Sequence, residues 1–204
     1  MRLRSGLLIG LFGLVVVLFG GWVFTLAIAL LTYIALLEFF RMAEFTGIKP
    51  ATKTTIFSCF IITISTYLEA IGFLDREIYN SILPICSVGI CTWLLLQPKP
   101  GTIADIAASI FGLFYLGFLP SYWIKLRTFQ ITINNSSDGI LTFESFLNSS
   151  GLYLTLISCL LIVASDIGSY FIGKSFGKKA LSPISPSKTI EGLIGGIICS
   201  ISVA

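Results

Sequence analysis

Apolar runs of about 20 residues, the length a helix needs to cross a membrane, follow one another along most of this chain. Hydrophobic residues make up 55% of its 204 residues and charged residues only 11%, whereas a soluble globular domain carries about 25% charged residues. So few charges cannot cover a surface that faces water, and lipid is therefore the natural solvent of this sequence. The sequence predicts an all-α, polytopic membrane protein.

The first apolar run, residues 6–40, is too long for one span, because a single helix of that length would measure about 50 Å against a hydrocarbon core of about 30 Å. Gly20 and Gly21 lie near its middle and favour a break, so we expect two short helices that form a hairpin. The prediction is about seven transmembrane helices. The other five are expected over residues 54–74, 79–96, 103–124 and 151–172, and from about Thr189 onward.

The distribution of positive charge supports this count, since cytoplasmic segments are enriched in Lys and Arg. With the N-terminus inside, the inner segments hold ten basic residues and the outer segments hold three, which are Arg76, Lys125 and Arg127. If the first run were one span, five would lie inside and eight outside. We therefore expect a multi-pass protein of the cell membrane, with its N-terminus and residues 174–188 in the cytoplasm. Residues 128–150, rich in Asn and Ser, would form an outer loop.

Ionisable groups inside membrane spans are costly and therefore informative. Asp105 stands near the start of its helix and is interpreted as a helix cap, whereas for Glu69 an interfacial role and a functional one are equally open. Asp166 lies deep in the helix expected over residues 151–172. Polar or small residues beside it and on the same helix face form a stripe, namely Ser165, Ser169, Tyr170 and Gly173. A carboxylate in such a stripe has to face a protein cavity or water, so a functional role is favoured over a structural hydrogen bond.

A short basic segment, GKSFGKKALSPISPSKTIEG over residues 173–192, follows this helix. Its hydroxyl-rich stretch runs directly into the last helix, where backbone amides and the helix dipole favour an anion such as phosphate. The alternative is an ordinary helix start with a Ser cap. Residues 168–175 also match the P-loop pattern GxxxxGK[ST], but they end a membrane helix that no strand precedes, which argues against a P-loop. The candidate phosphate-binding residues are Lys174, Lys178, Ser182, Ser185, Ser187, Lys188 and Thr189.

Histidine is absent from the sequence, which removes the commonest general base and the commonest metal ligand. Any bound metal would therefore be held by oxygen ligands, which favours Mg²⁺. The five cysteines lie in apolar stretches without a CxxC pair. They are interpreted as small buried residues, and neither a disulfide framework nor a zinc site is expected.

Residues 165–196, SDIGSYFIGKSFGKKALSPISPSKTIEGLIGG, closely resemble the corresponding stretch of bacterial-type phosphatidate cytidylyltransferases, the CDP-diacylglycerol synthases. In that family a Ser-Asp-x-Gly-x-Tyr helix end leads to a Gly-Lys/Arg-x-x-Gly-Lys loop, and a Ser-Pro-x-Ser-Pro-x-Lys-Thr-x-Glu-Gly segment follows. The N-terminal part matches only in style. The matching residues are Ser165, Asp166, Gly168, Tyr170, Gly173, Lys174, Gly177, Lys178, Ser182, Pro183, Ser185, Pro186, Lys188, Thr189, Glu191 and Gly192.

The resemblance implies transfer of CMP from CTP to phosphatidate, which gives CDP-diacylglycerol and pyrophosphate in phospholipid biosynthesis. It implies Mg²⁺ as cofactor and CTP, phosphatidate and membrane lipid as partners, with a homodimer left open and no nucleic acid. The predicted catalytic residues are Lys188, Asp166 and Glu191. Lys188 and the hydroxyls would bind phosphates, while Asp166 and Glu191 would organise the metal, with Asp166 as its ligand, or orient Lys188. Residues 1–204 would form one membrane domain, with N-terminal helices and an outer loop in 1–150 and the start of the catalytic region in 151–204.

Members of that family also carry a C-terminal signature with a Lys-Asp pair, a His-Gly-Gly segment and further aspartates, and residues 1–204 contain none of it. We therefore expect an N-terminal fragment, with the main metal-binding carboxylates beyond residue 204 and its activity alone in question. Two other functions stay open. One is a CTP-dependent lipid kinase of the polyprenol or phytol type, and the other is a transporter in which Asp166 and Glu69 couple ions.

Overall fold

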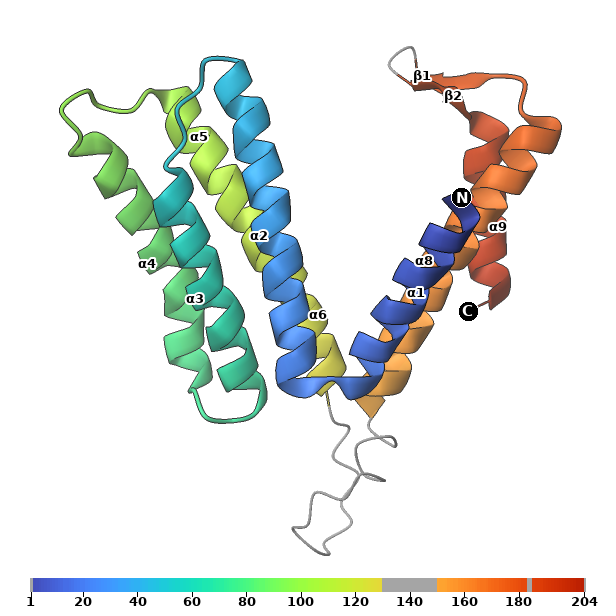
Figure 1. The fold of residues 1–204 in the computed structure, drawn as a ribbon, viewed down its shortest axis with the longest axis horizontal. Coiled ribbons are helices and arrows are strands. Elements are labelled where there is room, and N and C mark those ends of the chain that lie inside the picture. Colours follow the sequence, from blue (N-terminus) through green and yellow to red (C-terminus); the bar gives the residue numbers. More distant parts are fainter. Residues whose placement is uncertain (1, 130–149, 183–184, 204) are drawn as a thin grey trace, which may run out of the picture. The chain divides into compact units, whose positions relative to one another are not determined.

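The computed structural model describes residues 2–129, 150–182 and 185–203. Helices account for most of these residues, as the sequence predicts, and the chain divides into two compact units, Met1–Leu152 and Tyr153–Ala204 (Figure 1). Most of the expected outer loop over residues 128–150 lies outside the described part of the chain.

The first unit is a helical bundle. Gly20 and Gly21 separate its first two helices with φ angles of 59° and 50°, a left-handed conformation that glycine adopts without steric cost. The break predicted near Gly20 is therefore confirmed. The helices of this unit are α1 (Arg2–Phe19), α2 (Gly21–Phe45), α3 (Thr52–Ala70), α4 (Arg76–Leu95), α5 (Ile103–Phe111) and α6 (Leu119–Thr128), with the π-helical stretch η1 (Gly112–Phe118) joining α5 to α6.

The prediction that the first two helices are both short is wrong for α2, which has 25 residues. The helix continues past residue 40 to Phe45. Arg41 and Glu44 are exposed there, so the helix can continue without burying their charges. Among the residues that the structure describes, four helices are long and apolar enough to cross a membrane. These four are Gly21–Phe45, Arg76–Leu95, Ile103–Thr128 and Ser150–Phe176. The prediction of about seven spans is not confirmed.

Helix α3 explains part of this difference. It contacts α2, α4, α5, η1 and α6, and so occupies the centre of the first unit. Its many hydroxyl side chains lower its hydropathy, but most of them are buried against neighbouring helices, and several bond to its own backbone. Thr63 and Thr66 donate to the carbonyls of Cys59 and Ile62 at 2.8 and 2.7 Å. A central helix can therefore be less apolar than one that faces lipid.

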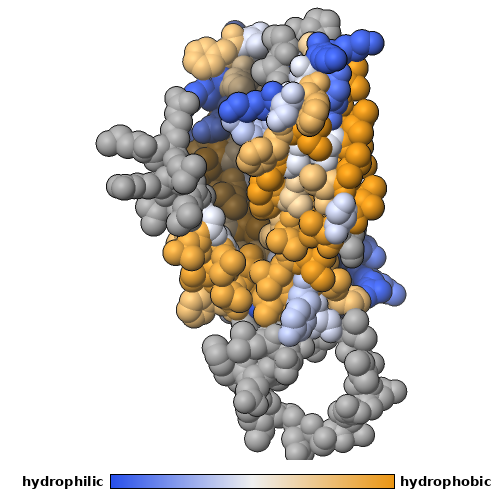
Figure 2. All heavy atoms as spheres, turned by 90° about the vertical axis from the view of Figure 1, so that its right-hand side faces the viewer, coloured by the Kyte–Doolittle hydropathy of each residue, from blue (hydrophilic) through white to orange (hydrophobic). Residues whose placement is uncertain are grey.

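Apolar side chains from α2, α3, α4 and η1 form the core of this unit. Fully buried members include Leu36, Phe40, Ile62, Ile90 and Leu113. Large hydrophobic residues on the outside stay exposed, among them Phe57 and Trp93. Figure 2 views the molecule from the right-hand side of Figure 1, where residues 150–182 and 185–203 are drawn. On that face too, hydrophobic residues cover the middle of the helices and hydrophilic residues lie toward their ends. An apolar outer surface of this kind suits contact with lipid.

The second unit consists of most of α8 (Ser150–Phe176), the strands β1 (Ala180–Ser182) and β2 (Ser185–Thr189), and α9 (Ile190–Val203). The two strands pair antiparallel, with Ala180 opposite Thr189. The all-α prediction did not include this hairpin. Its physical cause is visible in the sequence, because Ser182 and Ser185 each precede a proline, and proline pushes the residue before it into the extended region.

Candidate active site

Close packing of α8 against α9 positions the basic segment between them. Glycines allow this approach, because a Cβ atom on Gly192 would lie 2.8 Å from the carbonyl oxygen of Ser169, and one on Gly196 would lie 2.9 Å from that of Ser165. Small residues at such spacing let two membrane helices come into backbone contact. The end of α8 and the start of α9 are therefore held together.

The same packing divides the polar stripe predicted on α8. Ser165 and Ser169 face the glycines of α9, and Gly173 lies against Thr189 and Gly192. Asp166 and Tyr170 are exposed instead. Asp166 stands eight residues before Lys174, which is about 12 Å along a helix. A carboxylate at this depth in an apolar helix has to meet water, a cation or protein and not lipid.

The junction between β2 and α9 starts the last helix. The Thr189 hydroxyl accepts a hydrogen bond from the N–H of Gly192 at 3.1 Å, so Thr189 is the N-cap of a helix that begins at Ile190. An ordinary capped helix start is therefore present, as the alternative from the sequence had it, although the cap is Thr189 and not a Ser. The N–H of Ile190 donates to the carbonyl of Lys179 at 3.0 Å, which joins the helix start to the segment after α8.

Glu191 lies in the first turn of α9. Its Oε2 accepts hydrogen bonds from the backbone N–H groups of Lys178 at 3.1 Å and Lys179 at 3.4 Å. Hydrogen bonds from its own backbone N–H, from Lys178 and from Lys179 lower the pKa of the Glu191 carboxyl. The group is therefore ionised at neutral pH, and its negative charge stands at the positive end of the helix dipole.

The lysines predicted to bind phosphate are on the surface of this segment. Lys174, Lys178 and Lys188 are all exposed, whereas Ser182, Ser185 and Thr189 are half-buried. The Lys174 ammonium lies 5.7 Å from the centre of the Tyr170 ring, within the range of a cation–π contact. The side chain of Ser187 falls outside the described part of the structure. The segment from the end of α8 to β2 thus carries several exposed positive charges, and their binding of phosphate stays a prediction.

Asp105 serves as a helix cap, which confirms its interpretation from the sequence. Its carboxylate accepts hydrogen bonds from the N–H groups of Lys49 at 2.6 Å and Thr102 at 2.7 Å. The Thr102 hydroxyl in turn accepts from the N–H of Asp105, which completes a capping box at the start of α5. Asp105 therefore belongs to the framework of the first unit.

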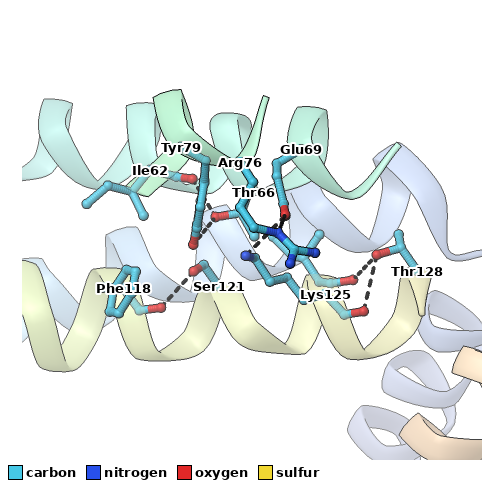
Figure 3. A network of polar contacts seen from close by, with 10 residues as sticks. Ile62, Thr66, Glu69, Arg76, Tyr79, Phe118, Ser121, Lys125 and Thr128 are labelled. Atoms are coloured by element: carbon cyan, nitrogen blue, oxygen red, sulfur yellow. Dashed lines mark hydrogen bonds and ion pairs between the residues drawn. The ribbon is translucent and has the colours of Figure 1, made fainter. Parts of the chain in front are cut away.

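Glu69 belongs to a polar network at the ends of α3, α4 and α6 (Figure 3). Its carboxylate lies 3.0 Å from the Lys125 ammonium and 3.6 Å from Arg76 Nε. The Lys125 ammonium also sits 3.8 Å from the centre of the Tyr79 ring. This pairing with Lys125 was not predicted, because 56 residues separate the two in sequence and only folding brings them together. A structural role accounts for Glu69.

Arg127 is a second residue whose role the sequence did not reveal. It is buried, and its Nε and Nη2 donate to the carbonyls of Val17 at 2.9 Å and Leu18 at 3.3 Å. These carbonyls end α1 and lack partners within the helix, so a cation there satisfies them and complements the helix dipole. Its only sequence signal was a basic residue at the end of a membrane span.

Oxygen donors for a divalent cation are sparse within residues 2–129, 150–182 and 185–203. No group of three or more His, Cys, Asp or Glu side chains comes together there. Asp166 offers one exposed carboxylate. Magnesium is often held by only one or two carboxylates, with substrate phosphates and water as its other ligands. A single aspartate is compatible with such a site as one of its ligands.

Long apolar helices and an exposed basic segment between two of them describe an integral membrane protein. The model of the Cytidylyltransferase family matches residues 1–204, and the chain belongs to this family.

Several curated relatives carry the name phosphatidate cytidylyltransferase. The one from Synechocystis sp. is 40% identical over 188 residues, which cover 87% of this chain and 61% of the relative. A chloroplastic one from Arabidopsis thaliana is 33% identical over 99% of this chain and 53% of the relative. The Bacillus subtilis protein is 28% identical over the full chain and 69% of its own length. The chain thus spans roughly half to two thirds of these relatives. No solved structure gives a significant match.

Proposed function

We propose that the protein to which this chain belongs transfers CMP from CTP to phosphatidate and releases pyrophosphate. The observation that carries this proposal is the set of exposed lysines between the end of α8 and the N-terminus of α9, of which Lys188 lies in β2. The name of the curated relatives supports the same reaction. In this transfer an oxygen of the lipid phosphate bonds to the α-phosphorus of CTP, and the bond from that phosphorus to the pyrophosphate oxygen breaks.

The chain's own residues would act by binding and by balancing charge. Lys174, Lys178 and Lys188 would contact the phosphates, together with hydroxyls of Ser182, Ser185, Ser187 and Thr189. Preorganised positive charge at a transferring phosphoryl group is a principal means of catalysis in such reactions. Asp166 and Glu191 are the other two residues on which we expect transfer to depend.

Asp166 is the proposed magnesium ligand in this chain. Its exposure in an otherwise apolar helix supports the proposal, because a bound cation would offset the cost of the carboxylate at that depth. Magnesium would neutralise charge on the phosphates of CTP. Further carboxylates are expected from the remainder of the protein.

The proposed orientation places the N-terminus and residues 174–188 in the cytoplasm. CTP would then reach the hairpin from water, and phosphatidate would approach from the inner leaflet. The excess of Lys and Arg on that side supports this orientation.

The proposal is tested on the full-length protein in detergent micelles, with CTP, phosphatidate and Mg²⁺. We expect CDP-diacylglycerol and pyrophosphate in equal amounts, and no turnover when Mg²⁺ is chelated. Formation of CDP and a lipid phosphate from a polyprenol would instead identify the kinase. A protein that consumes no CTP with either lipid would contradict both enzyme functions and favour the transporter.

A further inference from the structure

Backbone N–H groups bind the carboxylate of Glu191. Two consecutive N–H groups, of Lys178 and Lys179, donate to the same oxygen at 3.1 and 3.4 Å. These residues precede β1, whereas Glu191 lies in α9, twelve or thirteen residues later. The contact therefore fastens the end of the segment after α8 to the first turn of the next helix.

Other contacts close the same junction. The N–H of Ile190 donates to the carbonyl of Lys179 at 3.0 Å. Gly177 lies so close to Thr189 that a Cβ atom on the glycine would be 2.7 Å from Thr189 Cγ2. The backbone at residues 177–179 is thus fixed from one side by β2 and from the other by Glu191.

The pairing of β1 with β2 brings Lys188 close to the backbone of residues 177–179. Ala180 pairs with Thr189. Lys179 directly precedes Ala180 and Lys188 directly precedes Thr189, so the pairing brings the two lysines close together. The side chains of Lys178, Lys179 and Lys188 are exposed. A lysine holds a phosphate as a flexible point charge, so the place of its backbone decides where that charge can reach.

We propose that Glu191 is a positioning residue, whose carboxylate holds the backbone of Lys178 and Lys179 against α9 so that their ammonium groups and that of Lys188 converge on one phosphate chain. This inference rests on the proposed function and gives Glu191 a role distinct from that of a metal ligand or a base. Glutamine keeps an oxygen that accepts hydrogen bonds from both N–H groups, although it loses the charge. Alanine removes the acceptor.

Glu191→Gln and Glu191→Ala in the full-length protein separate the possible roles. Hydrogen exchange, followed by mass spectrometry, reports directly on the amides of Lys178 and Lys179. Loss of a charge-assisted hydrogen bond corresponds to roughly a tenfold change or more, so we expect exchange at these amides to rise about tenfold in Glu191→Ala and less in Glu191→Gln. A peptide from residues 103–118 should exchange as in wild type, which shows that the fold is kept.

Activity with CTP and phosphatidate supplies the second measurement. We expect kcat to fall about tenfold in Glu191→Ala, with substantial recovery in Glu191→Gln and the same Mg²⁺ requirement in all variants. The matched controls are Glu77→Gln and Glu77→Ala, because Glu77 is exposed in the first turn of α4; they should change neither readout.

Two results would overturn the inference. In one, the amides of Lys178 and Lys179 exchange at the wild-type rate in Glu191→Ala. In the other, Glu191→Gln is as inactive as Glu191→Ala while its amides stay protected, which would mean direct contact with metal or substrate. If the wild-type protein forms no CDP-diacylglycerol, the proposed function fails, and the exchange measurement alone still decides whether Glu191 holds this turn.

Discussion

Lys188 combines three properties that few residues of this chain share. It is exposed, it directly precedes the N-cap of α9, and it lies in a strand that is paired with β1. An ammonium group at the start of a helix adds to the positive potential of the helix dipole. A phosphate that approaches the N-terminus of α9 would meet the positive charge of Lys188 and the positive end of the helix dipole.

Replacement of Lys188 tests this interpretation. Lys188→Met removes the charge, and we expect the rate of CDP-diacylglycerol formation to fall roughly ten- to a hundredfold, as for the loss of a charged hydrogen bond of about 1.5–3 kcal/mol. Lys188→Arg keeps the charge with a different shape and should retain part of the activity. Because the contact is made with the transferring group, kcat should fall as well as the affinity for CTP. Unchanged turnover of Lys188→Met at every CTP concentration would contradict a contact between Lys188 and the transferring phosphate.

Asp105 and Asp166 are both carboxylates in membrane helices, but their surroundings predict opposite effects of substitution. Asp105 holds two backbone N–H groups at 2.6 and 2.7 Å, so Asp105→Ala should lower the free energy of unfolding by about 1–2 kcal/mol, as for loss of a helix cap. Thermal unfolding in detergent measures this. Transfer by the folded protein should be little changed.

Asp166→Ala should have the opposite effects to Asp105→Ala. Its thermal unfolding should stay near wild type, and CDP-diacylglycerol formation should be lost. The matched control is Asp75→Ala, because Asp75 is exposed and makes no capping hydrogen bond at the start of α4. Equal loss of transfer from Asp105→Ala and Asp166→Ala would show that the two residues had been ranked wrongly.

At the scale of elements, the contact between α8 and α9 links membrane packing to the hairpin. Both ends of the hairpin are attached to these helices, so a shift of α9 along or away from α8 would displace Thr189 and Glu191 together. Gly196 faces the Ser165 carbonyl at a distance that leaves no room for a methyl group.

We therefore expect Gly196→Ala to lower the free energy of unfolding by about 1–3 kcal/mol, the usual cost of overpacking, and to reduce transfer through the displaced helix. The control is Gly89→Ala in α4, where an added Cβ atom meets no other atom within 4 Å. That variant should be at least as stable as wild type, because alanine favours a helix more than glycine does. Circular dichroism during heating in detergent compares the two, and equal stability would mean that α8 and α9 are packed less closely than described.

Local signals explain which elements the sequence could predict. The break at Gly20 and the helix of residues 150–176 follow from glycine and from a long apolar run, both of which are visible within one segment. The hairpin and the role of Glu191 depend on pairing between residues 178–182 and 185–191, which no single window shows. Glu69 and Lys125 are further apart still. The residue types of the candidate site are visible in the sequence, but its hydrogen bonds are not.

At the scale of the whole molecule, charge is distributed unevenly between the ends of the helices. In the first unit, Lys49, Lys53 and Lys99 lie in or next to the α2–α3 and α4–α5 connections, at one end of the bundle (Figure 1). The basic residues Arg76, Lys125 and Arg127 lie at the other end. Arg76 and Lys125 pair with Glu69, and Arg127 binds carbonyls of α1. The excess of free positive charge therefore lies at the end with the α2–α3 connection, as expected for a cytoplasmic side.

The orientation of the basic hairpin follows from the same rule and can be measured by cysteine labelling in intact cells. Ser175 is exposed at the end of α8, and Asp75 is exposed at the start of α4. In the proposed orientation Asp75 lies on the outer side. In a protein whose own cysteines have been replaced, Asp75→Cys should react with a membrane-impermeant maleimide added outside the cells. Ser175→Cys should react only after the membrane is permeabilised. Each site serves as the control for the other. If expression or the reagent failed, neither cysteine would be labelled, which differs from the expected result. Reaction of Ser175→Cys in intact cells would place the lysines of residues 174–188 outside, away from cytoplasmic CTP, and would contradict the orientation and the proposed route of the nucleotide together.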